Sequence, residues 1–304
     1  MRATSRLSQH EPTNTALLTR HCGGPFRTVV LFLALAITAS IGLPFVPGGE
    51  GIAGASAPFT SQTFNMAAGN KDYNFSGQET DAMNAVLWSV NQGDPWTVAL
   101  QEVCSNTADT IAWDLGASYL YHYHVGQQHP SYCSNSSATH GNAVFAVGAP
   151  LTGGIDLLLT PADPNDSEPR YLNCIHAQNI GFDYYGCTLH AAKNTSYAPA
   201  QAQAALNELN SHSTWAVAGG DFNQVPNAGS PNATANWYWD YQEMHSINGA
   251  YWTTIGNVKY DYIWARRTHA TNTTVASQAC AFVYNATPRA LSDHKYCKAS
   301  FVYS

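Results

Sequence analysis

Two short segments in the C-terminal third of the sequence combine carboxylates with an imidazole. Gly219-Gly220-Asp221-Phe222-Asn223 brings a carboxylate and an amide close together, and Ser292-Asp293-His294 places a carboxylate directly before a histidine. A third segment, Gln101-Glu102, adds a carboxylate upstream. Carboxylates and amides bind hard cations such as Mg²⁺, and histidine exchanges protons near neutral pH. Together, these residue types could bind a divalent metal and hydrolyse a phosphoester.

Several of the candidate side chains lie at an end of a segment that predicts a β-strand. Residues 97–100 are apolar or β-branched and lead directly to Gln101-Glu102, and residues 214–218 lead to Asp221. Asn65 and His190 also end expected strands, and Asp261 opens one. Functional residues concentrate at such places because the rigid scaffold behind them fixes their geometry. The pattern therefore favours a site assembled from strand ends.

The elements that must position these residues are mostly strands. Only two segments, 79–92 and 198–209, carry apolar residues at helical spacing. Because strands outnumber helices and no second linker interrupts the sequence, we predict one α+β domain with mixed sheets over residues 58–304, not a doubly wound parallel sheet. Strands are expected at 63–66, 97–100, 119–125, 143–147, 155–159, 171–176, 184–190, 214–218, 260–265, 275–283 and 298–303.

The first 57 residues have a different character. An apolar run at 28–46 follows a basic stretch and precedes Pro47-Gly48-Gly49, which is typical of a targeting segment. Ala53-Gly54-Ala55 offers a cleavage site. We therefore expect residues 1–57 to be a signal peptide and linker of a secreted protein. The alternative is an uncleaved signal anchor that holds the domain outside the membrane.

The composition describes a folded and acidic domain. The 304 residues are 45% hydrophobic and 12% aromatic, so the chain can bury a large core and is not a disordered tail. The formal net charge is -7, and from Ser56 onward nine basic residues stand against eighteen acidic ones. This balance argues against a broad basic surface for nucleic acid, so a nuclease would depend on a local patch or on bound cations.

Cysteine usage agrees with export. Cys22 precedes the apolar run, and the six remaining cysteines predict three disulfides in an oxidising compartment. Six cysteines allow many connectivities, and the sequence does not decide among them. Short loops between expected neighbouring strands would be closed by Cys174 with Cys187 and by Cys280 with Cys297, which leaves Cys104 with Cys133. No Cys-x-x-Cys spacing occurs, which disfavours a zinc site.

The order of the candidate residues resembles the endonuclease/exonuclease/phosphatase superfamily, which includes deoxyribonuclease I, neutral sphingomyelinases and inositol polyphosphate phosphatases. This resemblance implies a four-layer α/β/β/α sandwich of two mixed, mainly antiparallel sheets with outer helices. It also implies metal-dependent hydrolysis of a phosphodiester at one rim. The segments that carry it are Phe64-Asn65-Met66, Leu100-Gln101-Glu102-Val103, Gly141-Asn142-Ala143-Val144, Thr188-Leu189-His190, Gly220-Asp221-Phe222-Asn223, Tyr260-Asp261-Tyr262-Ile263 and Ser292-Asp293-His294.

The resemblance implies a metal set. Glu102 would be the principal ligand of Mg²⁺, or of Mn²⁺ or Ca²⁺, because a cation that retains waters needs only one or two carboxylates. Asn65 would help to hold the metal or a phosphate oxygen, and Asp293 would add a further carboxylate. No organic cofactor is implied.

It also implies a catalytic set. Asp221 would activate or orient the attacking water, and Asn223 would donate a hydrogen bond to the developing charge. His294, oriented by Asp261, would contact the phosphate as general acid or base. His190 matches a further histidine of the nuclease-like members, where it donates to the phosphate or protonates the leaving oxygen.

The sequence departs from the deoxyribonuclease pattern at one position. A glutamate that would partner His190 is expected between the Gln-Glu and Gly-Asn segments, yet residues 118–142 contain no acid. His190 is therefore expected to lack a carboxylate partner. Further candidates for substrate contacts are Tyr121, Asn142, Lys193 and Arg266.

Three functional hypotheses follow. The leading one is a monomeric, secreted, deoxyribonuclease-like endonuclease acting on nucleic acid. The alternative substrate is a phospholipid or phosphoinositide, favoured by the acidic body and by aromatic residues at 236–241 and 251–252, whose default interpretation is core packing. A catalytically silent binding module is the third, and the retained metal and histidine residues argue against it.

Overall fold

All of the described residues lie within the unit Ile41–Ser304. The expected targeting segment, residues 1–57, lies outside the described residues. Among the residues described, no helix combines the length and apolar character that a membrane span requires. A computed structural model of the protein describes residues 59–67, 79–93, 95–123, 133, 137–166, 168–179, 182–225, 237, 241–243, 253–255, 258–266, 273–282 and 291–303.

The first sheet has the strand order β11-β12-β1-β2-β4-β3. Its β1 and β2 run parallel, and the other neighbouring strands pair antiparallel. The parallel pair matters for the site because it brings the ends of β1 and β2 to one rim, with Asn65 opposite Gln101. The strands are β1 (Phe59–Asn65), β2 (Thr97–Cys104), β3 (Ser118–Tyr123), β4 (His140–Ala146), β11 (Thr273–Ala281) and β12 (Tyr296–Tyr303).

The second sheet has the order β5-β6-β7-β8-β10-β9. Its only described parallel pair is β7 with β8, so both sheets are mixed and mainly antiparallel. The strands are β5 (Leu151–Leu158), β6 (Tyr171–Asn179), β7 (Phe182–His190), β8 (Trp215–Asp221), β9 (Tyr241–Glu243) and β10 (Asp261–Arg266).

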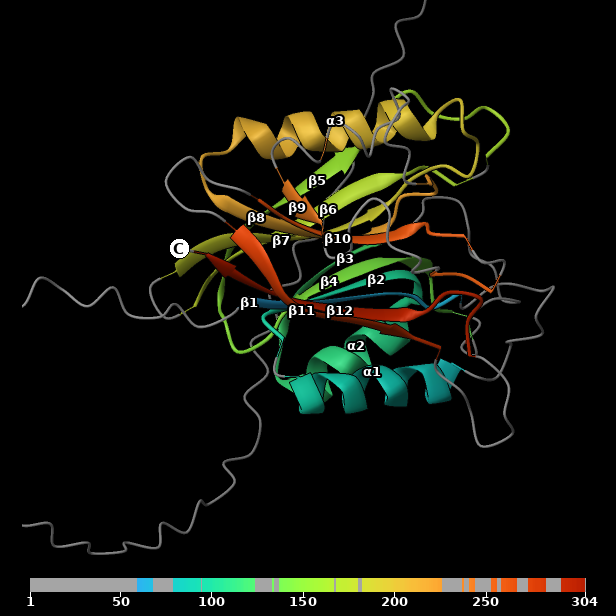
Figure 1. Ribbon diagram of the computed structural model, residues 1–304. Coiled ribbons are helices and arrows are strands. Elements are labelled where there is room, and N and C mark those ends of the chain that lie inside the picture. The colour runs from blue at the N-terminus through green and yellow to red at the C-terminus, as the bar shows by residue number, and fades with distance from the viewer. Residues whose placement is uncertain are drawn as a thin grey trace, which may run out of the picture. The chain divides into compact units, whose positions relative to one another are not determined.

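Helices cover the outer faces of both sheets. In Figure 1, α1 (Glu79–Gly93) and α2 (Ser105–Leu115) lie along the first sheet, and α3 (Ala198–Ser211) lies along the second. One hydrophobic core packs α1 and α2 against the first sheet, a second packs α3 against the other sheet, and a third fills the space between the sheets. The predicted four-layer α/β/β/α architecture is confirmed.

Local sequence explains the helices. Helix α1 buries Ala82, Val86 and Val90, which recur at the spacing of one helical face. Helix α2 was not predicted. It begins directly after β2, and it ends at Gly116, which adopts the left-handed conformation (φ 57°) and donates its N–H to the carbonyl of Trp113.

Two consecutive glycines allow close packing at the end of β8. A Cβ atom on Gly219 would lie 3.0 Å from Cβ of Thr63 in the facing sheet, and one on Gly220 would lie 1.9 Å from the carbonyl oxygen of Leu189. Glycine is therefore required at Gly220 by the neighbouring strand, and at Gly219 it lets the two sheets approach. The close approach at Gly219 brings the end of β8, and with it Asp221, near the first sheet.

Three disulfides link cysteines of the described region, with the pairs Cys104–Cys133, Cys174–Cys187 and Cys280–Cys297. Cys174 and Cys187 are direct partners across β6 and β7, and Cys280 and Cys297 are direct partners across β11 and β12. These two disulfides are the ones predicted from the short loops between neighbouring strands.

Candidate active site

Strand register brings three of the predicted side chains side by side on the second sheet. His190 at the end of β7 lies opposite Asp221 at the end of β8, and Asp221 lies opposite Asp261 at the start of β10. All three side chains are buried. Because β8 runs parallel to β7 and antiparallel to β10, the ends of β7 and β8 and the start of β10 lie at the same rim.

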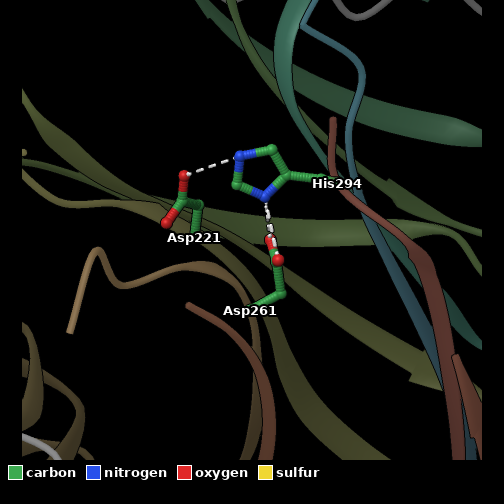
Figure 2. Close-up of side chains that lie close together, drawn as sticks. All are labelled: Asp221, Asp261 and His294. Carbon is green, nitrogen blue, oxygen red and sulfur yellow. Dashed lines mark hydrogen bonds and ion pairs between the residues drawn. The ribbon is translucent and has the colours of Figure 1, made fainter. Parts of the chain in front are cut away.

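His294 approaches this row from the first sheet. Its Nδ1 lies 2.9 Å from Oδ2 of Asp261, and its Nε2 lies 3.7 Å from Oδ2 of Asp221 (Figure 2). The Ser292 hydroxyl fixes the turn, since it donates to the carbonyl of Asn65 and accepts the N–H of His294. Since a carboxylate can only accept, Nδ1 of His294 carries a proton and Nε2 faces Asp221.

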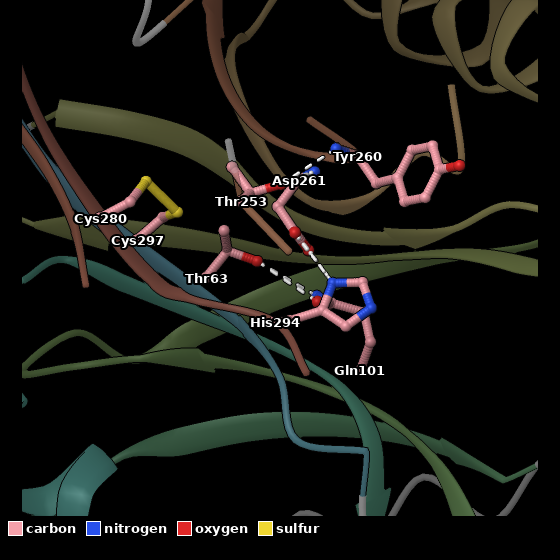
Figure 3. The surroundings of a disulfide bond; sticks show 8 residues. All are labelled: Thr63, Gln101, Thr253, Tyr260, Asp261, Cys280, His294 and Cys297. Carbon is pink, nitrogen blue, oxygen red and sulfur yellow. Dashed lines mark hydrogen bonds and ion pairs between the residues drawn. A yellow bond between two sulfur atoms is a disulfide. The ribbon is translucent and has the colours of Figure 1, made fainter. Parts of the chain in front are cut away.

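Asp261 is itself held in place. The hydroxyl oxygen of Thr253 accepts the backbone N–H groups of Tyr260 and Asp261 at 2.9 and 3.0 Å. Figure 3 shows this contact beside the Asp261–His294 pair and the Cys280–Cys297 disulfide. The chain on both sides of the pair is therefore anchored by hydrogen bonds.

Burial and charge shift the proton affinities of this group. Burial alone would lower the pKa of His294, but the carboxylates of Asp261 and Asp221 outweigh it and raise the pKa to about 10. Burial raises the pKa of Asp221 to about 7, although His294 opposes the shift. At neutral pH, the site therefore holds a protonated imidazole next to a carboxyl group that can exchange a proton.

Glu102 lies in an irregular part of β2. The pairing of β2 with β4 shifts register between Leu100 and Val103, and Glu102 has a left-handed backbone (φ 51°). Such a bulge turns a side chain away from the regular alternation of the strand. Gln101 anchors the bulge because its amide donates to Thr63 Oγ1 and to Thr188 Oγ1 in the facing sheet.

One amide connects the two carboxylates at the rim. Nδ2 of Asn65 lies 3.1 Å from Oε1 of Glu102 and 3.1 Å from Oδ2 of Asp221. Burial alone would raise the pKa of Glu102, but His140, Lys193 and the Asn65 hydrogen bond outweigh it and lower the pKa. Glu102 is therefore an ionised carboxylate that the Asn65 amide links to Asp221.

Two groups of residues could hold a cation. Donor atoms of Asp221, Asp261 and His294 lie within 4.8 Å of one another, all buried. In that group, however, Nδ1 of His294 already donates to Asp261. The raised pKa of His294 also keeps the ring protonated, so neither ring nitrogen has a lone pair for a metal. The ionised Glu102, together with the partly exposed Asp293, offers hard oxygen donors without that conflict.

Asn223 has the third left-handed backbone of the described non-glycine residues (φ 48°), after Ala67 and Glu102. Its N–H donates to Oδ1 of Asp221, and its side-chain Nδ2 donates to the carbonyl of Ala191. The second hydrogen of Nδ2 is not used by the Ala191 contact. Strained backbone at two predicted site residues is typical of a functional site.

Solved structures share the fold of this chain. An endonuclease/exonuclease/phosphatase family protein from Bacteroides thetaiotaomicron matches with a TM-score of 0.62 and 14% identity, over 82% of this chain and 96% of that chain. The human Nocturnin catalytic domain with bound sulfate anion matches with a TM-score of 0.61 and 17% identity, over 81% and 94% of the chains. The chain has the endonuclease/exonuclease/phosphatase fold.

A third structure with the endonuclease/exonuclease/phosphatase fold is D. rerio TDP2 complexed with a single-strand DNA product, with a TM-score of 0.62 and 13% identity over 81% of this chain and 99% of that chain. The sequence itself matches no protein-family model and no curated protein. The similarity is therefore one of fold, carried by the two sheets and their outer helices.

One functional candidate within this fold escaped the sequence analysis. Nη1 of the buried Arg170 lies 2.9 Å from both ring nitrogens of His190, and the same guanidinium is paired with Asp166 and Glu168. Nε2 of His190 also lies 3.7 Å from Glu102 and 3.8 Å from Asp221, so carboxylates do lie beside His190, although neither comes from residues 118–142. The only available signal was the cluster of charges at 166–170, which the strand pattern placed in a loop.

The four residues expected to contact substrate differ in where the structure places them. Lys193 acts on Glu102 by charge, and the buried amide of Asn142 has no hydrogen-bond partner among the described residues. Tyr121 lies in β3, and its side chain is outside the described atoms. Arg266 lies at the far end of β10 from Asp261, where Nη1 donates to the carbonyls of Leu209, His212 and Thr214, so these contacts give no support to substrate binding.

The aromatic segment 236–241 contributes a core residue. The Trp237 side chain is fully buried, packs edge-on against Phe222, and donates its indole N–H to the carbonyl of Ala202. At this position, the default interpretation of core packing is correct. The side chains of residues 236 and 238–241, and those of residues 251–252, lie outside the described atoms.

Proposed function

We propose that the protein is a divalent-metal-dependent phosphodiesterase, secreted and monomeric, and that it acts as a deoxyribonuclease-like endonuclease. The observation that carries the proposal is the meeting of Asp221, Asp261 and His294 beside Asn65 and Glu102. A buried acid–base group next to an ionised carboxylate suits phosphoester hydrolysis better than a purely structural role.

Glu102 and Asp293, with Asn65 beside them, would hold Mg²⁺ or a similar hard cation. When bound, the cation would neutralise charge on a phosphate oxygen. The partly exposed side chains of Glu102 and Asp293 make this set accessible from solvent. The acidic surroundings also mean that an anionic substrate would depend on such a cation.

The catalytic roles follow from the proton affinities. Asp221, with a pKa of about 7, would orient the attacking water and accept its proton. Protonated His294, oriented by Asp261, would donate a hydrogen bond from Nε2 to a phosphate oxygen. The remaining hydrogen of the Asn223 amide would donate to the same developing charge.

His190 would contact the phosphate or the leaving oxygen, because its Nε2 faces both Glu102 and Asp221. Lys193, Asn142 and Tyr121 are the further residues that we propose for substrate contacts. Lys193 supplies one of the few positive charges near the site. It would attract a backbone phosphate without the broad basic surface that the composition lacks.

The preferred substrate is nucleic acid. A structure of the same fold was solved with a single-strand DNA product, and that likeness supports this preference. The three disulfides support secretion, because such bonds persist in oxidising compartments.

A second substrate class has one observation in its favour. Val225 and Ile255 are exposed aliphatic residues, with 47% and 44% of their surface accessible. Val225 follows Asn223 closely, and the N–H of Ile255 donates to the carbonyl of Asp293. Exposed aliphatic side chains beside an acidic site would suit a phospholipid surface better than a nucleic acid.

A substrate panel tests the proposal. Supercoiled plasmid DNA and liposomes that contain phosphatidylcholine, sphingomyelin and phosphoinositide are incubated with the purified protein and Mg²⁺. Nicking that disappears with chelator and in Asp221→Ala supports the nuclease. Release of headgroups with intact DNA would select the lipid alternative, and no turnover of either substrate would favour a silent binding module.

A further inference from the structure

We propose that Arg170 is the positioning residue for His190, and that Asp166 and Glu168 hold Arg170 in place. This chain of contacts would take the place of the carboxylate partner that residues 118–142 do not supply. The inference rests on the proposed function, because the importance of His190 depends on it.

The contacts of Arg170 account for its three guanidinium nitrogens. Nε and Nη2 donate to Oδ2 of Asp166 at 2.9 and 2.7 Å. Nη1 lies 3.2 Å from Oε2 of Glu168 and 2.9 Å from the ring nitrogens of His190. The Arg170 side chain is only 3% exposed, so these contacts are largely shielded from water. Buried, multiply bonded guanidinium groups are rigid, because the planar fork fits only one arrangement of partners.

The contacts and burial of Arg170 argue against a direct role in phosphate binding. Its charge is offset by two carboxylates, and almost none of its surface is accessible. A phosphate ligand would need donors that point into solvent. The influence of Arg170 on catalysis must therefore pass through the residue that it touches inside the site, which is His190.

His190 is enclosed by charged groups from three directions. Arg170 precedes β6, Glu102 lies in β2 and Asp221 ends β8. A neutral imidazole has one acceptor nitrogen, so the guanidinium can donate to only one of the two ring nitrogens. Donation to Nδ1 would fix the rotation of the ring and leave the proton on Nε2. That rotation decides how Nε2 faces Glu102 and Asp221. A misplacement of about 1 Å can cost roughly 10²-fold in rate.

Lysine cannot reproduce this arrangement. A single ammonium on a flexible stem cannot bridge Asp166, Glu168 and His190 in one plane. We therefore expect Arg170→Lys to behave like Arg170→Met, and Asp166→Asn to have a smaller effect because Glu168 still holds the guanidinium. Matched controls are Lys298→Met, which removes a cation from β12, and Asp183→Asn, which removes the carboxylate that pairs with His176.

A double-mutant cycle with His190→Asn tests the proposal, with Mg²⁺-dependent hydrolysis of bis(4-nitrophenyl) phosphate as the readout. In the wild-type background, we expect Arg170→Met to lower kcat about 10- to 100-fold with KM changed less than about twofold. In the His190→Asn background, we expect no further loss, because residues that act as one unit are not additive. An equal loss in both backgrounds, or a rise in KM alone, would overturn the proposal in favour of direct phosphate binding.

A second readout does not need activity. In the metal-free protein, ¹H–¹⁵N spectra of the histidine rings are recorded for wild type, Arg170→Met and Asp166→Asn, with the His190 signals assigned through His190→Asn. We expect the His190 signals to shift in both variants and the His294 signals to stay in place. Unchanged His190 signals would refute the positioning role.

If the wild-type protein hydrolyses no phosphodiester, the proposed function fails. The spectra would still show whether Arg170 positions the His190 ring. If Arg170→Met does not fold, Asp166→Asn and Arg170→Lys provide both readouts.

Discussion

Nδ1 of His294 lies 2.9 Å from Oδ2 of Asp261 and 3.1 Å from its Oδ1, and both residues are buried. Asp261 starts β10 in the second sheet, whereas His294 precedes β12 in the first. The pair therefore joins the two sheets at the rim and fixes the ring so that Nε2 faces Asp221. Removal of the carboxylate should change both the orientation of the imidazole and its charge.

Asp261→Asn is expected to lower kcat about 10²- to 10⁴-fold, the range that a misplaced acid–base group usually costs. Asp261 is the largest of the contributions that raise the pKa of His294, so its loss should bring that pKa down toward the ordinary histidine value. The imidazole then loses its proton at lower pH. The alkaline limb of the kcat/KM profile should therefore move to lower pH, and an unmoved limb would show that His294 is not the group that titrates.

The stability of the metal-free protein should fall as the pH rises. The folded-state pKa of His294 is raised to about 10, so its stabilising contribution is complete below the unfolded pKa of about 6.5 and is lost as the pH rises toward 10. Thermal unfolding between pH 6 and pH 10 measures this effect. The decline should be steeper for wild type than for His294→Gln, and parallel curves would contradict the assigned shift.

Glu102→Gln should weaken metal binding more than it weakens the fold. Glu102 is the ionised carboxylate of the proposed metal set, and a neutral amide is a poorer ligand for a hard cation. We expect the Mg²⁺ concentration for half-maximal activity to rise about 10-fold or more, and calorimetric titration should show weaker binding. Glu208→Gln on α3 is the matched control because its partner is His212, away from the rim. Equal metal affinity in wild type and Glu102→Gln would remove Glu102 from the metal set.

Gly220→Ala should be severely destabilising. The new Cβ would lie 1.9 Å from the carbonyl oxygen of Leu189, so either β7 or β8 must move. A backbone shift in a packed sheet costs about 3 kcal/mol or more of unfolding free energy. Denaturant unfolding measures the loss, with Gly153→Ala as the control because its nearest neighbour would be 3.7 Å away. A change below about 1 kcal/mol would refute the close approach.

The sequence predicted the parts of the site that depend on local pattern. Strand ends located Glu102, Asp221 and Asp261 because alternating and apolar segments mark strands and their limits. The sequence could not show that Asp261 lies opposite Asp221, because register arises from pairing between distant strands.

Arg170 and α2 were missed for related reasons. Arg170 reaches His190 from the position just before β6, the strand next to β7, and no local spacing connects residues that are 20 positions apart. Helix α2 begins immediately after β2, where the strand pattern and the helix pattern overlap. Arg266 was selected for its proximity to Asp261 in sequence, yet an extended strand carries its side chain to the opposite end of β10.

The most direct test of the central claim is the rate of bis(4-nitrophenyl) phosphate hydrolysis by wild type and His294→Ala over a series of Mg²⁺ concentrations. We predict that the wild-type rate rises with Mg²⁺ to a plateau and falls to background with chelator, and that His294→Ala stays at least 100-fold lower throughout. Folding of the variant is checked by circular dichroism. A wild-type rate that is indifferent to chelator, or a folded His294→Ala variant with full activity, would contradict the account.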